Sequence, residues 1–99
     1  MIRGTTPTHI FNIPFEASTL YSARVVYKQG MVEIRKEAED ITLSGNQIKV
    51  TLTQEDTLKF DHRLPVKIQL RVKTNTGKAL STKPRTVSVD ECLDGEVLA

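Results

Sequence analysis

Apolar and polar residues alternate along much of this chain of 99 residues. In residues 66–73, Val, Ile, Leu and Val alternate with Lys, Gln, Arg and Lys; in residues 48–52, Ile, Val and Leu alternate with Lys and Thr. A period of two places the apolar side chains on one face of an extended strand and the polar ones on the other. Both segments are therefore predicted to be strands of an antiparallel sheet with one buried and one solvated face.

Five further segments repeat the alternation. Their same-parity apolar residues are Phe11, Ile13 and Phe15; Ala23, Val25 and Tyr27; Val32 and Ile34; Ile41 and Leu43; and Val87 and Val89. Glycine-containing segments at 29–30, 44–46 and 75–77 are typical of turns, and residues 36–40 are interpreted as a charged connection. About seven strands, with turns roughly every eight to twelve residues, predict one all-β domain over residues 1–99, a single antiparallel Ig-like β-sandwich.

The segment between the two clearest strands has the pattern of a capped helical turn. Thr53 can act as the N-cap, and the carboxylate of Asp56 follows three residues later, as in a capping box. An alternative interpretation is that Glu55 and Asp56 form a carboxylate site. The capping chemistry favours a structural corner that carries the chain from one sheet to the other.

Composition and charge place few limits on the partner. The formal net charge is +2, from 14 basic and 12 acidic residues spread along the chain. Cys92 is the only cysteine, so no intrachain disulfide can form, which fits a reducing cytoplasm. No apolar run resembles a secretory signal or a membrane span. We therefore expect a protein made in the cytoplasm, unless it leaves the cell as part of a larger particle.

The residues that usually carry chemistry do not form a recognisable pattern. His9, His62 and Cys92 are far apart in the sequence, whereas structural zinc sites have closely spaced ligand pairs. The acidic residues between 90 and 96 lack the spacing of a calcium-binding loop. No glycine-rich phosphate loop and no nucleophile with a nearby base is present. We predict no catalytic, metal or cofactor-binding residues and expect that the chain is not an enzyme.

Basic residues on the polar parity of several predicted strands could form a basic outer face. They are Arg24, Lys28, Arg35, Lys67, Arg71 and Lys73. One interpretation is a ligand-binding module for carbohydrate or nucleic acid. Aromatic residues, which usually stack on such ligands, make up only 5% of the chain and lie mostly on the apolar parity. The favoured interpretation is a solvated face with cross-strand pairs to Glu33 or Glu37.

The C-terminal tail, residues 91–99, contains apolar residues beyond the last predicted strand. Leu93, Val97 and Leu98 are the candidate interface residues. Two alternatives are open for them: the tail folds back over a sheet edge, or it docks on a neighbouring subunit.

Three segments of the chain carry a family resemblance: RGTTPTHIFNIPF, IKVTLTQEDTLKFD and VKIQLRVKTNTGKALSTKP. In order and spacing they resemble small Ig-like proteins of phages and prophages, in particular the N-terminal domain of siphophage baseplate upper proteins. Arg3, Gly4, Thr6 and Pro7 match the opening of that domain, and Leu52, Asp56 and Thr57 match its corner. The resemblance implies a non-enzymatic structural or assembly module of a tail or baseplate. Its partners would be other copies of the chain or other virion proteins. From the residues we expect no membrane contact, and nucleic acid is the less favoured partner.

Overall fold

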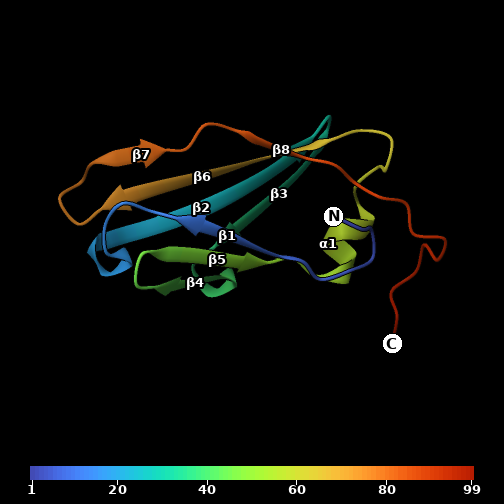
Figure 1. Cartoon of the computed structure of the whole chain (residues 1–99), viewed down its shortest axis with the longest axis horizontal. Helices are drawn as coiled ribbons and strands as arrows, with labels where there is room; N and C mark the ends of the chain where they lie inside the picture. The colour runs from blue at the N-terminus through green and yellow to red at the C-terminus, as the bar shows by residue number, and fades with distance from the viewer.

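Two antiparallel sheets pack face to face in the computed structural model, which describes all residues 1–99 (Figure 1). The three-stranded sheet has the order β1 (Thr8–Asn12), β5 (Gln47–Thr51), β4 (Ile41–Ser44). The five-stranded sheet has the order β3 (Val32–Glu37), β2 (Leu20–Gln29), β6 (Val66–Thr74), and β6 also pairs with β7 (Ala79–Ser81) and β8 (Arg85–Val87). The predicted all-β sandwich is confirmed.

The strand order is that of an Ig-like sandwich. β1-β5-β4 corresponds to the B-E-D strands of that fold, and β3-β2-β6-β7 corresponds to its C′-C-F-G strands. An isolated parallel bridge joins Ile2 to Asp90, so the start of the chain runs beside the segment that follows β8. Gly30 and Gly45 have φ values of +55° in the β2–β3 and β4–β5 hairpins, the left-handed conformation that the predicted turns require.

Strand boundaries differ from the predicted ones in three places. β1 ends at Asn12, before Pro14, because proline cannot donate to the sheet. Lys36 and Glu37 belong to β3 and not to a connection. The last part of the chain forms two short strands, β7 and β8, which gives eight strands in all. Between them the Thr82 hydroxyl accepts a hydrogen bond from the Leu70 amide at 3.1 Å.

The core lies between the sheets and follows the two-residue alternation. Its fully buried side chains include Ile48, Val50 and Leu52 from one layer and Val25, Tyr27, Val66 and Ile68 from the other. Burial of such side chains is the main stabilising contribution in a thin sandwich, worth roughly 1.5–3 kcal/mol for each one. The polar residues of most strands face outward, which leaves two outer faces for contact with other molecules. The exceptions are His9 of β1 and Lys36 of β3, which contact Tyr27 and Asp56, and Ile10 of β1, which is 44% exposed.

The predicted corner forms as α1 (Gln54–Leu58). The Thr53 hydroxyl accepts a hydrogen bond from the Asp56 amide at 3.1 Å, and the Asp56 carboxylate accepts one from the Thr53 amide at 2.9 Å, so the capping box is confirmed. Two single 3₁₀ turns, η1 (Ala17–Thr19) and η2 (Ala38–Asp40), complete the structure. None of these helical segments has the length and apolar character needed to cross a bilayer.

Candidate interaction site

The C-terminal tail is anchored at its base and exposed along the rest of its length. The Asp90 amide donates to the Met1 carbonyl at 2.7 Å, and the Arg3 amide donates to the Asp90 carbonyl at 3.1 Å. The side chains of Leu93, Val97 and Leu98 are 97%, 47% and 75% exposed. These predicted interface residues are therefore displayed to solvent and are not packed over a sheet edge.

One further contact ties the tail to α1. The Leu98 amide donates to the Gln54 side-chain oxygen at 2.7 Å, and the Gln54 side-chain nitrogen donates to the Leu98 carbonyl at 3.1 Å. Both bonds involve the backbone of the tail, so they leave the Leu98 side chain free. Because they are few and exposed, they can exchange for bonds to a partner at little cost.

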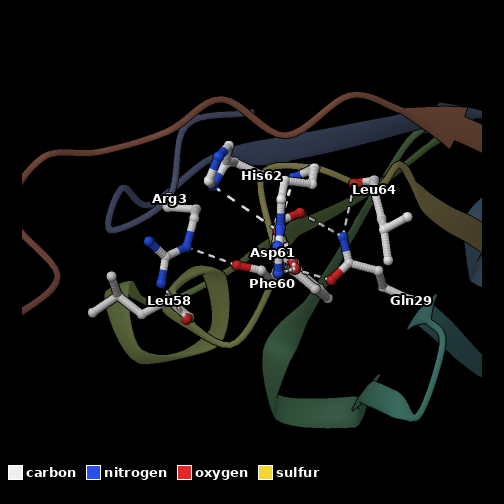
Figure 2. A network of polar contacts seen from close by, with 8 residues as sticks. Arg3, Gln29, Leu58, Phe60, Asp61, His62 and Leu64 are labelled. Carbon is white, nitrogen blue, oxygen red and sulfur yellow. Dashed lines mark hydrogen bonds and ion pairs between the residues drawn. The ribbon is translucent and has the colours of Figure 1, made fainter.

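The corner beneath the tail is braced by two side chains from distant parts of the chain (Figure 2). Arg3 donates from Nε to the Phe60 carbonyl at 2.7 Å and from Nη2 to the Leu58 carbonyl at 3.0 Å, which satisfies carbonyls at the end of α1. The buried Gln29 donates to the Asp61 and Leu64 carbonyls and accepts from the Asp61 amide, each at 2.7 Å. The tail therefore leaves from a fixed base.

The polar groups around this brace form hydrogen bonds and ion pairs with one another. Arg63 donates to Asp61 through its side chain at 2.7 Å and through its backbone, and these bonds hold the pKa of Asp61 well below its usual range. His62 Nδ1 lies 3.9 Å from the Asp61 carboxylate. These residues and Arg3 line a shallow hollow of about 400 Å³. Because its carbonyls and its carboxylate already accept hydrogen bonds, the hollow is a structural brace.

The other predicted candidates for chemistry also have structural partners. His9 Nδ1 lies 2.7 Å from the hydroxyl of Tyr27, which is fully buried. Burial raises the pKa of Tyr27, and burial together with the charge of Arg85 lowers the pKa of His9. Both groups are therefore neutral at pH 7 and share one hydrogen bond inside the core. No three or more His, Cys, Asp and Glu side chains are grouped as metal ligands, and Cys92 is a half-buried free thiol.

One ion pair lies between the layers. The Lys36 ammonium is 2.7 Å from the Asp56 carboxylate, and their side chains are 13% and 11% exposed. Burial alone would raise the pKa of Asp56, but hydrogen bonds from Lys36 and Thr53 outweigh it and lower the pKa. Sequence reasoning did not find this pair, because Lys36 was assigned to a connection and its partner lies 20 positions further along the chain.

A groove lies at the end of the sandwich where β6 terminates and β7 begins. Its volume is about 510 Å³. Apolar residues of both layers line it, among them Ala23 and Val72 from the five-stranded sheet and Ile41 and Leu43 from β4. The charged residues that line it are Arg24, Arg71 and Lys73, which are basic, and Glu37, which pairs with Arg24. Apolar walls with a few charged groups are typical of binding sites. We call this feature the end groove.

The outer face of the five-stranded sheet carries like charges in register. Lys28 lies directly opposite Lys67, and Arg24 lies directly opposite Arg71. Glu37 pairs with Arg24, as the sequence predicted for a cross-strand partner. The three basic residues of β6 form no ion pair within the chain; they are Lys67, Arg71 and Lys73. On the other side of β2, Glu33 and Glu37 of β3 lie directly opposite Lys28 and Arg24, so an external anion would add most to the unpaired basic residues of β6.

Comparison of the chain with protein-family models, with curated proteins and with solved structures finds no match. The functional assignment must therefore come from the three surface features just described: the tail, the end groove and the basic face.

Proposed function

We propose that this chain is a non-enzymatic assembly module that acts through protein–protein contacts made by its tail. The observation that carries the proposal is the display of Leu93, Val97 and Leu98 on an anchored arm. Burying a leucine or valine side chain in a partner is worth roughly 1.5–3 kcal/mol, so an exposed apolar arm is a source of binding energy. The resemblance to Ig-like domains of phage particles supports a tail or baseplate setting.

The brace beneath the tail gives the proposal a physical mechanism. A partner that binds the tail has to order only the residues beyond Cys92, because the segment at Asp90 is already held by backbone hydrogen bonds. A short ordered segment costs less conformational entropy on binding than a long one. The arm can therefore bind with useful affinity although it is small.

Light scattering over a range of protein concentrations tests the proposal. The wild-type mass should rise with concentration, whereas the mass of a Leu93→Asp/Leu98→Asp variant should stay at the monomer value with an unchanged unfolding midpoint. Met31→Asp is the matched control, because Met31 is a fully exposed apolar residue at the β2–β3 turn and does not belong to the tail. A tail variant that associates as strongly as the wild type would contradict the proposal.

A second candidate is a ligand-binding module for nucleic acid or carbohydrate that uses the basic face. The opposed pairs Lys28–Lys67 and Arg24–Arg71 favour it, because a polyanion would relieve their repulsion. Binding of a labelled single-stranded DNA should then weaken steeply as salt is added. The Lys67→Glu variant should give a smaller slope of the logarithm of the binding constant against the logarithm of the salt concentration. Affinity that is absent at low salt, or that does not respond to salt, would exclude nucleic acid as the ligand.

A further inference from the structure

The tail and the end groove have complementary chemistry. Residues 91–99 contain three acidic residues, no basic residue and the three exposed apolar side chains. The end groove combines apolar walls with Arg71 and Lys73, neither of which forms an ion pair within the chain, while its one acidic residue, Glu37, is paired with Arg24. We infer that the tail of one copy docks in the end groove of a second copy; this rests on the proposed function and names the partner.

An extended tail has the side-chain pattern that this groove requires. Successive side chains of an extended segment point to opposite sides, so Leu93 and Val97 share one side and Asp94 and Glu96 share the other. The apolar side can contact Leu43 and its neighbours while the carboxylates contact the basic residues. Same-side residues in an extended chain are about 6.6 Å apart, which is also the spacing of Arg71 and Lys73 along β6.

The position of the two features favours contact between copies over contact within one copy. The end groove lies where β6 ends and β7 begins, and the tail lies beside α1 at the opposite end of the molecule (Figure 1). The molecule measures 46 Å along this axis. Seven residues beyond Cys92 reach about 23 Å when fully extended, so the arm is too short to span its own domain but can cross to a neighbour.

This contact is heterologous, because a tail meets a groove and not another tail. Each copy keeps one free tail or one free groove after docking, so the copies add head to tail into an open chain or a closed ring. A seven-residue arm buries less than the roughly 1,200 Å² of a stable complex, so we expect each contact to be weak and association to require a high protein concentration.

A charge swap in the full chain tests the inference by sedimentation velocity. Asp94→Lys/Glu96→Lys and Arg71→Glu/Lys73→Glu should each weaken association roughly tenfold or more, and the variant with all four changes should associate again. Lys49→Glu is the control, because it reverses a charge on the outer face of the three-stranded sheet and leaves the groove unchanged. The swap distinguishes a direct contact from a general effect of net charge.

A second experiment tests the apolar contact and the direction of assembly. Leu43→Asp in the groove should abolish association, whereas Ile10→Asp should not; these side chains are 45% and 44% exposed on opposite faces of the three-stranded sheet. Thermal unfolding confirms that each variant is folded. A mixture of the Leu43→Asp and Leu93→Asp/Val97→Asp variants retains one intact tail and one intact groove, so it should give dimers and nothing larger.

The outcomes separate this inference from the proposed function. Tail variants that abolish association while groove variants behave like their controls would overturn the inference and leave the tail as the contact. Tail variants without effect would overturn both. A wild-type protein that is monomeric up to millimolar concentration, or charge variants that lose DNA binding with no change in mass, would overturn docking between copies.

Discussion

The outer faces of the two sheets differ in how their polar side chains are satisfied. On the three-stranded sheet, Thr8 bonds Thr51 at 2.8 Å and Gln47 bonds Asn12 at 3.2 Å, and Lys49 is the only charged residue of that face. On the five-stranded sheet, Lys28 and Arg24 of β2 lie opposite acidic residues of β3 on one side and basic residues of β6 on the other. The first face is stabilised by neutral cross-strand pairs, whereas the second combines attractive and repulsive charge pairs and keeps the charges of β6 available for binding.

The two ends of the sandwich also differ, and the end groove lies at the more highly charged one. It lies between the sheets but shares Arg24 and Arg71 with the charged face. An anion bound at the groove would therefore also neutralise one of the two opposed pairs. Local instability and binding capacity coincide at this end of the sandwich, whereas the opposite end is braced by Arg3 and Gln29.

The largest expected effect comes from comparing a paired with an unpaired lysine of the five-stranded sheet. Lys36→Met leaves the Asp56 carboxylate largely buried without its cation and should lower the free energy of unfolding by about 3 kcal/mol. Lys67→Met removes a charge that faces Lys28 and should be neutral or slightly stabilising. Urea denaturation measures both. Equal losses would show that the outer lysines are also satisfied within the chain.

Acid should weaken the ion pair between Lys36 and Asp56. The pKa of Asp56 is lower in the folded protein than in the unfolded chain, so its stabilising contribution is complete above the unfolded value of about 4 and is lost as the pH falls below it. The wild type should therefore lose more stability than Lys36→Met between neutral and strongly acidic pH. Urea midpoints at several pH values test this, and parallel curves for the two proteins would rule it out.

A smaller gain is expected from Arg71→Glu. The substitution replaces a like-charge pair with an opposite-charge pair across from Arg24, which should stabilise the fold by about 0.5 kcal/mol. Lys49→Glu on the other sheet, which faces Ile10 and Thr42, should change stability by less. Thermal unfolding of the two variants gives the comparison. If Arg71→Glu also weakens association, this position trades stability for binding.

Salt should have the smallest effect. Screening weakens the repulsion between Lys28 and Lys67, so added salt should raise stability by a few tenths of a kcal/mol. The Lys67→Met variant lacks this pair and should respond less. Unfolding midpoints in low and moderate salt measure the difference, and a decrease for the wild type would mean that attractive pairs dominate the basic face.

A comparison of individual residues shows which features of the fold a local sequence pattern can predict. Alternation placed Ile48 and Val66 in the core, and spacing alone identified the Thr53 cap, because each signal spans only a few residues. The brace was missed because its partners are remote: Arg3 bonds a carbonyl 57 positions away, and Gln29 bonds one 32 positions away. Gln29 was assigned to a turn, yet it is 6% exposed at the end of β2.

The candidate site was only partly predictable for the same reason. Composition identified Leu93, Val97 and Leu98 as apolar residues beyond the sheet, and the structure shows where they leave the domain. The end groove joins β2, β4, β6 and β7, so no contiguous segment contains its pattern. The packing of one sheet on the other brings Leu43 near the basic residues.

The parallel bridge between Ile2 and Asp90 has a mechanical consequence for a string of docked copies. Tension pulling on an arm passes first through the two hydrogen bonds that join Asp90 to Met1 and Arg3. Because these segments run side by side in the same direction, a pull along them loads both bonds at once and does not unzip them in sequence. The N-terminal segment of each copy would therefore resist unfolding when a series of docked copies is stretched.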